Sequence, residues 1–126
     1  MEKYLLIADD SAMVTQLISV TLEAEGYDIL EASSGAQAVS VAREVGPEVV
    51  VLDVTMPGSI DGLRACEVIK SDDLLKDTYV VMVSARGSRE DIARAMQAGA
   101  DAYLVKPFSP KRLIDIIQSR RPWQAG

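Results

Sequence analysis

A run of four apolar residues that ends on a carboxylate constrains the fold of this chain more than any other feature. The run is Val49-Val50-Val51-Leu52, and Asp53 follows it directly. A strand with one face in water would alternate polar and apolar residues, so this run indicates a strand buried on both faces of a parallel sheet. Asp53 then lies at the carboxyl end of that strand, where open α/β sheets bind their ligands. Since an isolated aspartate there more often only starts a turn, the interpretation depends on the other strand ends.

Apolar periodicity divides the remainder of the chain into alternating strands and helices. Strands are predicted at Tyr4–Ala8, Tyr27–Ala32, Val49–Leu52, Tyr79–Val83 and Ala102–Val105. Each strand is followed by a predicted helix. The second of these helices runs from Ser34 to about Val45. The other four show apolar residues at helical spacing: Val14, Leu17, Ile18 and Leu22 in the first, Leu63, Cys66 and Ile69 in the third, Ile92, Ala95 and Met96 in the fourth, and Leu113, Ile116 and Ile117 in the fifth. This alternation predicts a flavodoxin-like doubly wound α/β fold, (βα)5, with a five-stranded parallel sheet in the order 2-1-3-4-5.

Length and composition narrow the possible functions. The 126 residues predict one domain, which we place at residues 1–120, with residues 121–126 as a C-terminal tail or the start of a linker. A net charge of −6 disfavours direct nucleic-acid binding. No apolar run approaches the roughly 20 residues of a membrane span and no signal segment opens the chain, so we expect a cytoplasmic protein that does not contact membranes. The chain has no histidine, which argues against triad hydrolases and zinc sites.

Reactive side chains follow four of the five predicted strands. They are Asp9-Asp10, Asp53, Ser84 and Lys106, and the doubly wound fold collects all of them on one edge of the sheet. Because neighbouring strands lie about 4.8 Å apart, Asp9, Asp10 and Asp53 are expected to share one pocket. Two carboxylates at ~5 Å repel by roughly 3 kcal/mol at an effective dielectric constant of 20. Three carboxylates therefore predict a bound cation, and an oxygen-only ligand set favours Mg²⁺ or Mn²⁺.

A divalent cation beside a lysine and a hydroxyl describes a site for phosphate chemistry. The cation and Lys106 would neutralise phosphoryl oxygens, while Ser84 would donate a hydrogen bond to another. Asp53 is ionised at neutral pH, so it could accept a phosphoryl group without a general base, which suits a chain that lacks histidine. The predicted product is an aspartyl phosphate.

The ordered set of motifs resembles the receiver domain of two-component response regulators over essentially the whole chain. The motifs are Asp9-Asp10, Asp53-Val54-Thr55-Met56-Pro57 with Asp61-Gly62, Ser84-Ala85, Tyr103, and Lys106-Pro107-Phe108. The resemblance implies that Asp53 is the phosphoacceptor and that Asp9, Asp10, Asp53 and the Thr55 main-chain carbonyl hold Mg²⁺. It also implies that Lys106 contacts the phosphate, that Ser84 and Tyr103 form the switch, and that the Lys106–Pro107 bond is cis, as is usual in the family.

Two departures from the common family pattern stand out. The loop from Pro57 to Gly62 is one residue longer than the commonest version, and serine replaces the more frequent threonine at position 84. Ser84 keeps the hydroxyl but loses the methyl group that restricts its rotamer. Thr55 and Arg86, each two residues beyond a site residue, flank the phosphoryl group in the family and tend to tune its lifetime.

The implied function is a signalling module rather than an enzyme. It would receive a phosphoryl group from a sensor histidine kinase or a histidine phosphotransfer protein, and bind an output partner or fused effector through its fourth helix, fifth strand and fifth helix. Phosphorylation would draw Ser84 inward and let Tyr103 rotate from an exposed to a buried position.

Three alternatives remain open. The first is a receiver excised from a larger multidomain regulator or hybrid kinase, for which Arg120-Arg121-Pro122-Trp123 would begin a linker. The second is a haloacid-dehalogenase-like phosphohydrolase, which is disfavoured because its nucleophile lies on the first strand with a second aspartate two residues on. The third is a degenerate receiver that acts as a phosphate-independent scaffold.

Overall fold

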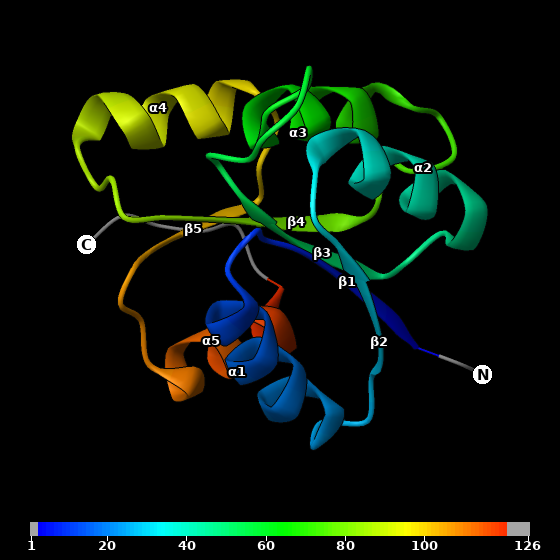
Figure 1. Ribbon diagram of the computed structural model, residues 1–126, viewed down its shortest axis with the longest axis vertical. Coiled ribbons are helices and arrows are strands. Elements are labelled where there is room, and N and C mark those ends of the chain that lie inside the picture. Colours follow the sequence, from blue (N-terminus) through cyan, green and yellow to red (C-terminus); the bar gives the residue numbers. More distant parts are fainter. Residues whose placement is uncertain (1–2, 121–126) are drawn as a thin grey trace.

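The computed structural model describes residues 3–120 as a sheet covered on both faces by helices (Figure 1). The strands are β1 (Tyr4–Ala8), β2 (Asp28–Ala32), β3 (Val49–Asp53), β4 (Tyr79–Ser84) and β5 (Ala102–Val105). The helices are α1 (Ala12–Glu23), α2 (Gly35–Val45), α3 (Gly62–Ser71), α4 (Arg89–Gln97) and α5 (Pro110–Ser119). α2, α3 and α4 cover one face of the sheet, and α1 and α5 cover the other.

All strand pairs in the sheet are parallel, and the order is β2-β1-β3-β4-β5. The predicted flavodoxin-like fold and strand order are therefore confirmed. β3 lies in the centre of the sheet, between β1 and β4, and each of its residues is buried. The register pairs Ala8 with Leu52 and Asp53 with Val83, so the ends of the three central strands lie at one edge.

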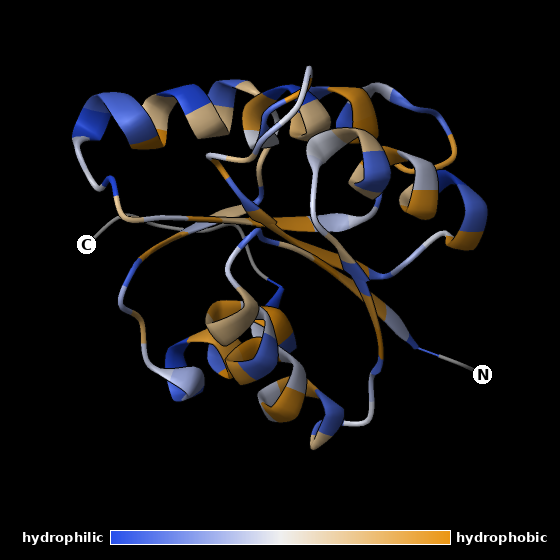
Figure 2. Cartoon of the chain, in the orientation of Figure 1, coloured by the Kyte–Doolittle hydropathy of each residue, from blue (hydrophilic) through white to orange (hydrophobic). Residues whose placement is uncertain are grey.

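Each face of the sheet carries its own apolar core. The central strands between the two cores are mostly orange, that is hydrophobic, in Figure 2. Successive side chains of a strand point to opposite faces, so Val50 and Leu52 pack under α2 and α3, whereas Val49 and Val51 pack against α1 and α5. This double burial accounts for the uninterrupted apolar run in β3.

Hydroxyl and carboxylate side chains start all five helices. Each N-cap side chain accepts a hydrogen bond from the backbone N–H three residues later, and these caps are Ser11, Ser34, Asp61, Ser88 and Ser109. At α2 the sequence spacing predicts a capping box. In the structure Gln37 instead accepts from the backbone N–H and hydroxyl of Ser33, one residue before the cap.

The apolar pattern of α1 only partly predicted its buried face. Ile18 and Leu22 are fully buried and Val14 is half-buried, but Leu17 is 46% exposed and Thr15 is buried in its place. Leu17 lies a quarter of a turn away from Ile18, on the solvent side with Met13 and Val20. Within residues 3–120, the helices are all too short or too polar to cross a membrane.

Candidate functional site

Three carboxylates meet where the central strands end. Asp9 and Asp10 follow β1, Asp53 is the last residue of β3, and carboxylate oxygens of the three lie within 4.8 Å of one another. Asp9 and Asp53 are 5% and 7% exposed, whereas Asp10 is open to solvent. The sequence prediction that these residues share one pocket is therefore what the geometry shows. Their oxygen-only donor set suits a hard divalent cation such as Mg²⁺.

Lys106 connects two of these carboxylates. Its Nζ lies 2.9 Å from Asp9 Oδ2 and 3.3 Å from Asp53 Oδ2, and its side chain is 21% exposed. Partial burial lowers the pKa of Lys106, but the hydrogen bond to Asp9 and the charges of Asp53 and Asp9 outweigh it, so the net pKa is raised. Lys106 is thus a fixed positive charge inside the acidic cluster. The Lys106–Pro107 peptide bond is cis, as the resemblance implied.

The Asp53 carboxylate is held at both oxygens. Oδ1 accepts a hydrogen bond from the backbone N–H of Thr55 at 3.1 Å, and Oδ2 faces Lys106. Burial raises the pKa of Asp53, the Thr55 N–H lowers it, the Asp9 charge raises it and Lys106 lowers it, with a net rise. The structure places Thr55 in the loop beyond Asp53, with an exposed side chain, and its role as a carbonyl ligand stays a prediction.

Gly62 brings the start of α3 against the end of β3. A Cβ atom at this position would lie only 1.9 Å from the Asp53 carbonyl oxygen, and the Gly62 N–H donates to Val54 O at 3.0 Å. Only a residue without a side chain permits this approach. The longer loop therefore closes tightly next to Asp53, despite the extra residue between Pro57 and Gly62.

Ser84 and Tyr103 are linked through the backbone of Arg86. Ser84 is buried at the end of β4, and its Oγ accepts from the Arg86 N–H at 3.0 Å. The Tyr103 hydroxyl donates to the Arg86 carbonyl oxygen. Tyr103 is only 3% exposed, and burial raises its pKa. The exposed resting position expected for Tyr103 is therefore wrong for this structure, because the ring packs in the core under α4 with its hydroxyl satisfied.

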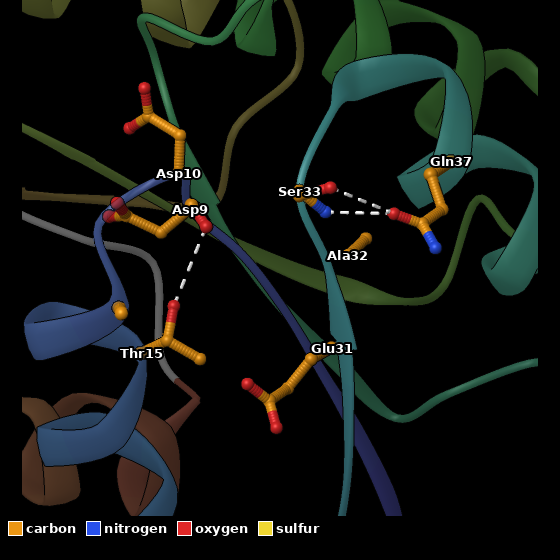
Figure 3. A pocket seen from close by; sticks show the side chains of 8 residues that line it. Asp9, Asp10, Thr15, Glu31, Ala32, Ser33 and Gln37 are labelled. Atoms are coloured by element: carbon orange, nitrogen blue, oxygen red, sulfur yellow. Dashed lines mark hydrogen bonds between the residues drawn. The ribbon is translucent and has the colours of Figure 1, made fainter.

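A polar cavity of about 340 Å³ opens on the β2 side of the carboxylates (Figure 3). Asp9 and Asp10 line it from one side, Glu31 from β2, Thr15 from α1 and Gln37 from α2. The Thr15 hydroxyl donates to the Asp9 carbonyl at 3.5 Å, which ties α1 to the end of β1. This cavity is continuous with the acidic cluster and belongs to the same site.

Sequence reasoning missed several residues around the site. Gly62 allows α3 to approach the Asp53 backbone, and its only sequence signal was the Asp61-Gly62 pair after the loop. Thr15 bonds through its hydroxyl to the Asp9 carbonyl, and its only signal was a polar residue on the helix face toward the sheet. The Arg86 backbone was missed because its contacts depend on its loop rather than on its side chain. Cys66 is buried, as expected, and burial raises its pKa to about 12, which makes it a packing residue rather than a reactive thiol.

Comparison with protein families decides the classification. The family model for the response regulator receiver domain matches residues 5–118. The chain belongs to the response regulator receiver domain family. Receiver domains are signalling domains and not classical enzymes, and the predicted resemblance is confirmed.

Relatives of this receiver domain include whole regulators and isolated domains. It is 32% identical over 120 residues to the DNA-binding response regulator MtrA of Mycolicibacterium paratuberculosis, which covers 95% of this chain but 52% of MtrA. The structure of chemotaxis response regulator CheY4 of Vibrio cholerae has a TM-score of 0.88 and 29% identity, covering 96% of this chain and 100% of that one.

A third relative is the receiver domain of the sensor histidine kinase PA1611 from Pseudomonas aeruginosa, solved with a magnesium ion in its active-site cleft. The TM-score is 0.85 at 25% identity, and the match covers 94% of this chain and 97% of that one. This receiver domain thus spans about half the length of its curated relative MtrA, which is named as DNA-binding. The expectation that no nucleic acid is bound concerns residues 1–126 alone and is not supported by this comparison.

Proposed function

We propose that this receiver domain accepts a phosphoryl group on Asp53, with Mg²⁺, from a sensor histidine kinase or a histidine phosphotransfer protein. The observation that carries the proposal is the cluster of the Asp9, Asp10 and Asp53 carboxylates, two of which, Asp9 and Asp53, pair with the ammonium group of Lys106. A buried, ionised carboxylate beside a fixed cation is a ready nucleophile for a phosphoryl group whose oxygens need positive charge around them.

In the proposed reaction, an oxygen of the Asp53 carboxylate forms a bond to phosphorus as the bond from phosphorus to the donor breaks. Lys106 neutralises a phosphoryl oxygen, and the Thr55 N–H orients the carboxylate. Asp9, Asp10, Asp53 and the Thr55 carbonyl are the proposed ligands of Mg²⁺, which supplies further neutralising charge when bound. Any turnover is limited to self-phosphorylation and self-dephosphorylation, with Arg86 and Thr55 flanking the product.

The first test is phosphorylation by a small donor. Incubation with acetyl phosphate and Mg²⁺ should add one hydroxylamine-labile phosphoryl group, measured by intact-mass spectrometry. EDTA should prevent the addition, since the three carboxylates would then face the incoming anion without a divalent cation. Equal phosphorylation with and without EDTA would contradict the metal requirement.

Asp10 offers a separate test of the metal site because it is exposed and, unlike Asp9 and Asp53, forms no ion pair with Lys106. We expect Asp10→Asn to weaken Mg²⁺ binding on the order of 10- to 100-fold, the range seen when metal-site residues are altered. Folding should not suffer, because the substitution removes a repelling charge. Calorimetric titration with Mg²⁺ and thermal unfolding without it measure the two effects.

The matched control for this experiment is Asp61→Asn. Asp61 is also exposed, but it caps α3 and does not belong to the acidic cluster. Asparagine caps helices as well as aspartate does, so stability should be retained. If Asp61→Asn weakens Mg²⁺ binding as much as Asp10→Asn, the effect is general electrostatics rather than ligation.

We further propose that the signal is passed on through Ser84 and Tyr103. Ser84 Oγ accepts the Arg86 N–H, and the Ser84 side chain also hydrogen-bonds to Tyr103, so the hydroxyl would turn from Tyr103 toward a phosphoryl group. A shift of Ser84 would move the Arg86 backbone, whose carbonyl holds the Tyr103 hydroxyl. The proposed readout surface is formed by α4, β5 and α5, where an output partner or fused effector would bind.

Ser84→Ala separates phosphorylation from switching. The variant should still be phosphorylated at Asp53, because within the described residues the Ser84 hydroxyl forms no hydrogen bond with Asp53 or Lys106. The Lys106 N–H bonds to the Ser84 backbone carbonyl at 2.8 Å, which alanine keeps. It should lack the phosphorylation-dependent amide shifts around Tyr103 and α5 that the wild-type protein shows by NMR. Wild-type-like shifts in Ser84→Ala would remove Ser84 from the switch.

We propose residues 1–120 as the functional unit. The family match to residues 5–118 supports this boundary, and the predicted tail or linker, residues 121–126, lies outside the described residues. We also propose a cytoplasmic location, because the proposed phosphodonors transfer their phosphoryl groups to aspartate inside the cell.

A further inference from the structure

A second cavity lies between α3 and α4, beside Tyr103 and the loop that follows β3. Its volume is about 320 Å³, within the range of small-molecule sites. The apolar part of its lining includes Met56, Leu63 and the ring of Tyr103. A smaller cavity of about 260 Å³ adjoins it and shares Leu63 and Arg94. Together they form an α3–α4 groove that begins beside the phosphorylation site.

Two cationic side chains of this groove form no close ion pair within the part of the chain that the structure describes. Arg86 and Arg94 both line the larger cavity, and within residues 3–120 neither guanidinium group forms a hydrogen bond or a close ion pair. In contrast, Arg43, Arg64 and Arg120 are all ion-paired. Unpaired guanidinium groups are effective donors to carboxylate, sulfonate or phosphate oxygens.

The two aspartates that also line the cavity are already engaged. Asp61 is the N-cap of α3 and accepts a hydrogen bond from the Arg64 N–H. Asp91 accepts a hydrogen bond from the hydroxyl of Ser88, the N-cap of α4. The hydrogen bond from Ser88 and the charges of Arg86 and Arg94 lower the pKa of Asp91. Both carboxylates lie in the first turn or cap of a helix, where the helix dipole offsets their charge.

We propose that this groove binds an organic anion with an apolar body, and that the bound ligand favours the buried position of Tyr103. The acidic group would lie between Arg86 and Arg94, and the apolar body would lie on Leu63, Met56 and the Tyr103 ring. A ligand that contacts the ring only when it is buried shifts the equilibrium toward that position by its differential affinity. The coupling to signalling rests on the proposed function, whereas the binding does not.

The test uses anilinonaphthalene sulfonate, a fluorescent anion with an aromatic body, on the unphosphorylated protein. Titration followed by NMR should shift the amides of Leu63, Arg94 and Tyr103 before those of other residues. The matched uncharged probe, N-phenylnaphthylamine, should bind at least about tenfold more weakly, because it lacks the charge-assisted hydrogen bonds. Shifts centred on α1, which exposes Met13, Leu17 and Val20, would overturn the proposed site.

Two arginines of α4 give a matched pair of variants. Arg94→Gln should weaken binding of the sulfonate probe about tenfold and leave binding of the uncharged probe unchanged. Arg89→Gln should change neither, because Arg89 is exposed on the same helix but does not line the groove. Equal effects of the two substitutions would mean that the probe responds to net charge, which overturns the site.

Tyr103→Phe tests the coupling. It keeps the ring but removes the hydroxyl bond to the Arg86 carbonyl, so the ring is buried for less of the time. Sulfonate affinity should then fall by roughly two- to tenfold, the equivalent of one hydrogen bond. Unchanged affinity would overturn the coupling but not the binding. Because no step requires phosphorylation, a failure here is distinct from a failure of Asp53 to accept phosphate.

Discussion

Replacing Asp53 by asparagine will abolish phosphoryl acceptance from acetyl phosphate and leave the fold intact. The carboxamide is a far weaker nucleophile than a carboxylate, and Asp9, the other buried carboxylate, is bonded to Lys106 and the Ser11 N–H. Intact-mass spectrometry with Mg²⁺ should therefore detect no phosphorylated protein. A variant that accepts phosphate as well as the wild type would refute Asp53 as the acceptor.

The fold should tolerate this substitution because the negative charge of Asp53 destabilises the folded protein. Its pKa is raised, chiefly by burial, so above its folded-state pKa the charged form is less favourable in the folded than in the unfolded chain. A neutral asparagine removes that penalty at neutral pH and can still accept the Thr55 N–H. Thermal unfolding should show a midpoint at or above that of the wild type, which excludes misfolding as the reason for lost phosphorylation.

Gly62→Ala will destabilise the protein more than any other glycine-to-alanine substitution in the described chain outside the left-handed turns. The new Cβ would lie 1.9 Å from the Asp53 carbonyl oxygen and 2.8 Å from its carbonyl carbon, which is backbone that cannot rotate away. α3 would have to separate from β3, so we expect a loss of about 3 kcal/mol in the free energy of unfolding. For a domain of this size, the unfolding midpoint falls on the order of 10 °C.

Gly46→Ala is the control for this prediction. Gly46 caps α2 with φ of 64°, and no atom lies within 4 Å of its added Cβ. Its cost is therefore conformational only, about 1 kcal/mol. If denaturant unfolding shows Gly62→Ala to be no worse than Gly46→Ala, the close approach of α3 to Asp53 is not as described. Slower phosphorylation of Gly62→Ala would reflect the displaced Asp53 backbone.

The sequence was most informative where burial or the end of a strand can be predicted from the local residue pattern alone. The unbroken apolar run of β3 reports burial on both faces, and a carboxylate directly after it reports a strand end. The grouping of Asp9, Asp10, Asp53 and Lys106 could be predicted because parallel strands bring their carboxyl ends to one edge. Strand ends are thus fixed by topology as soon as the order of the strands is known.

Features that depend on packing between distant segments could not be predicted in this way. Helical spacing does not distinguish Leu17 from Thr15, since the buried face of α1 is chosen by its contacts with the sheet and α5. The position of Tyr103 depends on the path of the loop at Arg86, and the cavity beside it depends on the distance between α3 and α4. These are tertiary effects with no local sequence signal.

The ion pair between Lys106 and Asp9 spans 97 residues of sequence and has a consequence for synthesis on the ribosome. The chain emerges from its N-terminus, so all three carboxylates leave the ribosome well before the lysine that balances them. A nascent chain that ends before β5 would carry the repelling acids but not the cation, and β4 would lack its neighbour β5. The charge-balanced cluster is therefore complete only when translation of this domain is nearly finished.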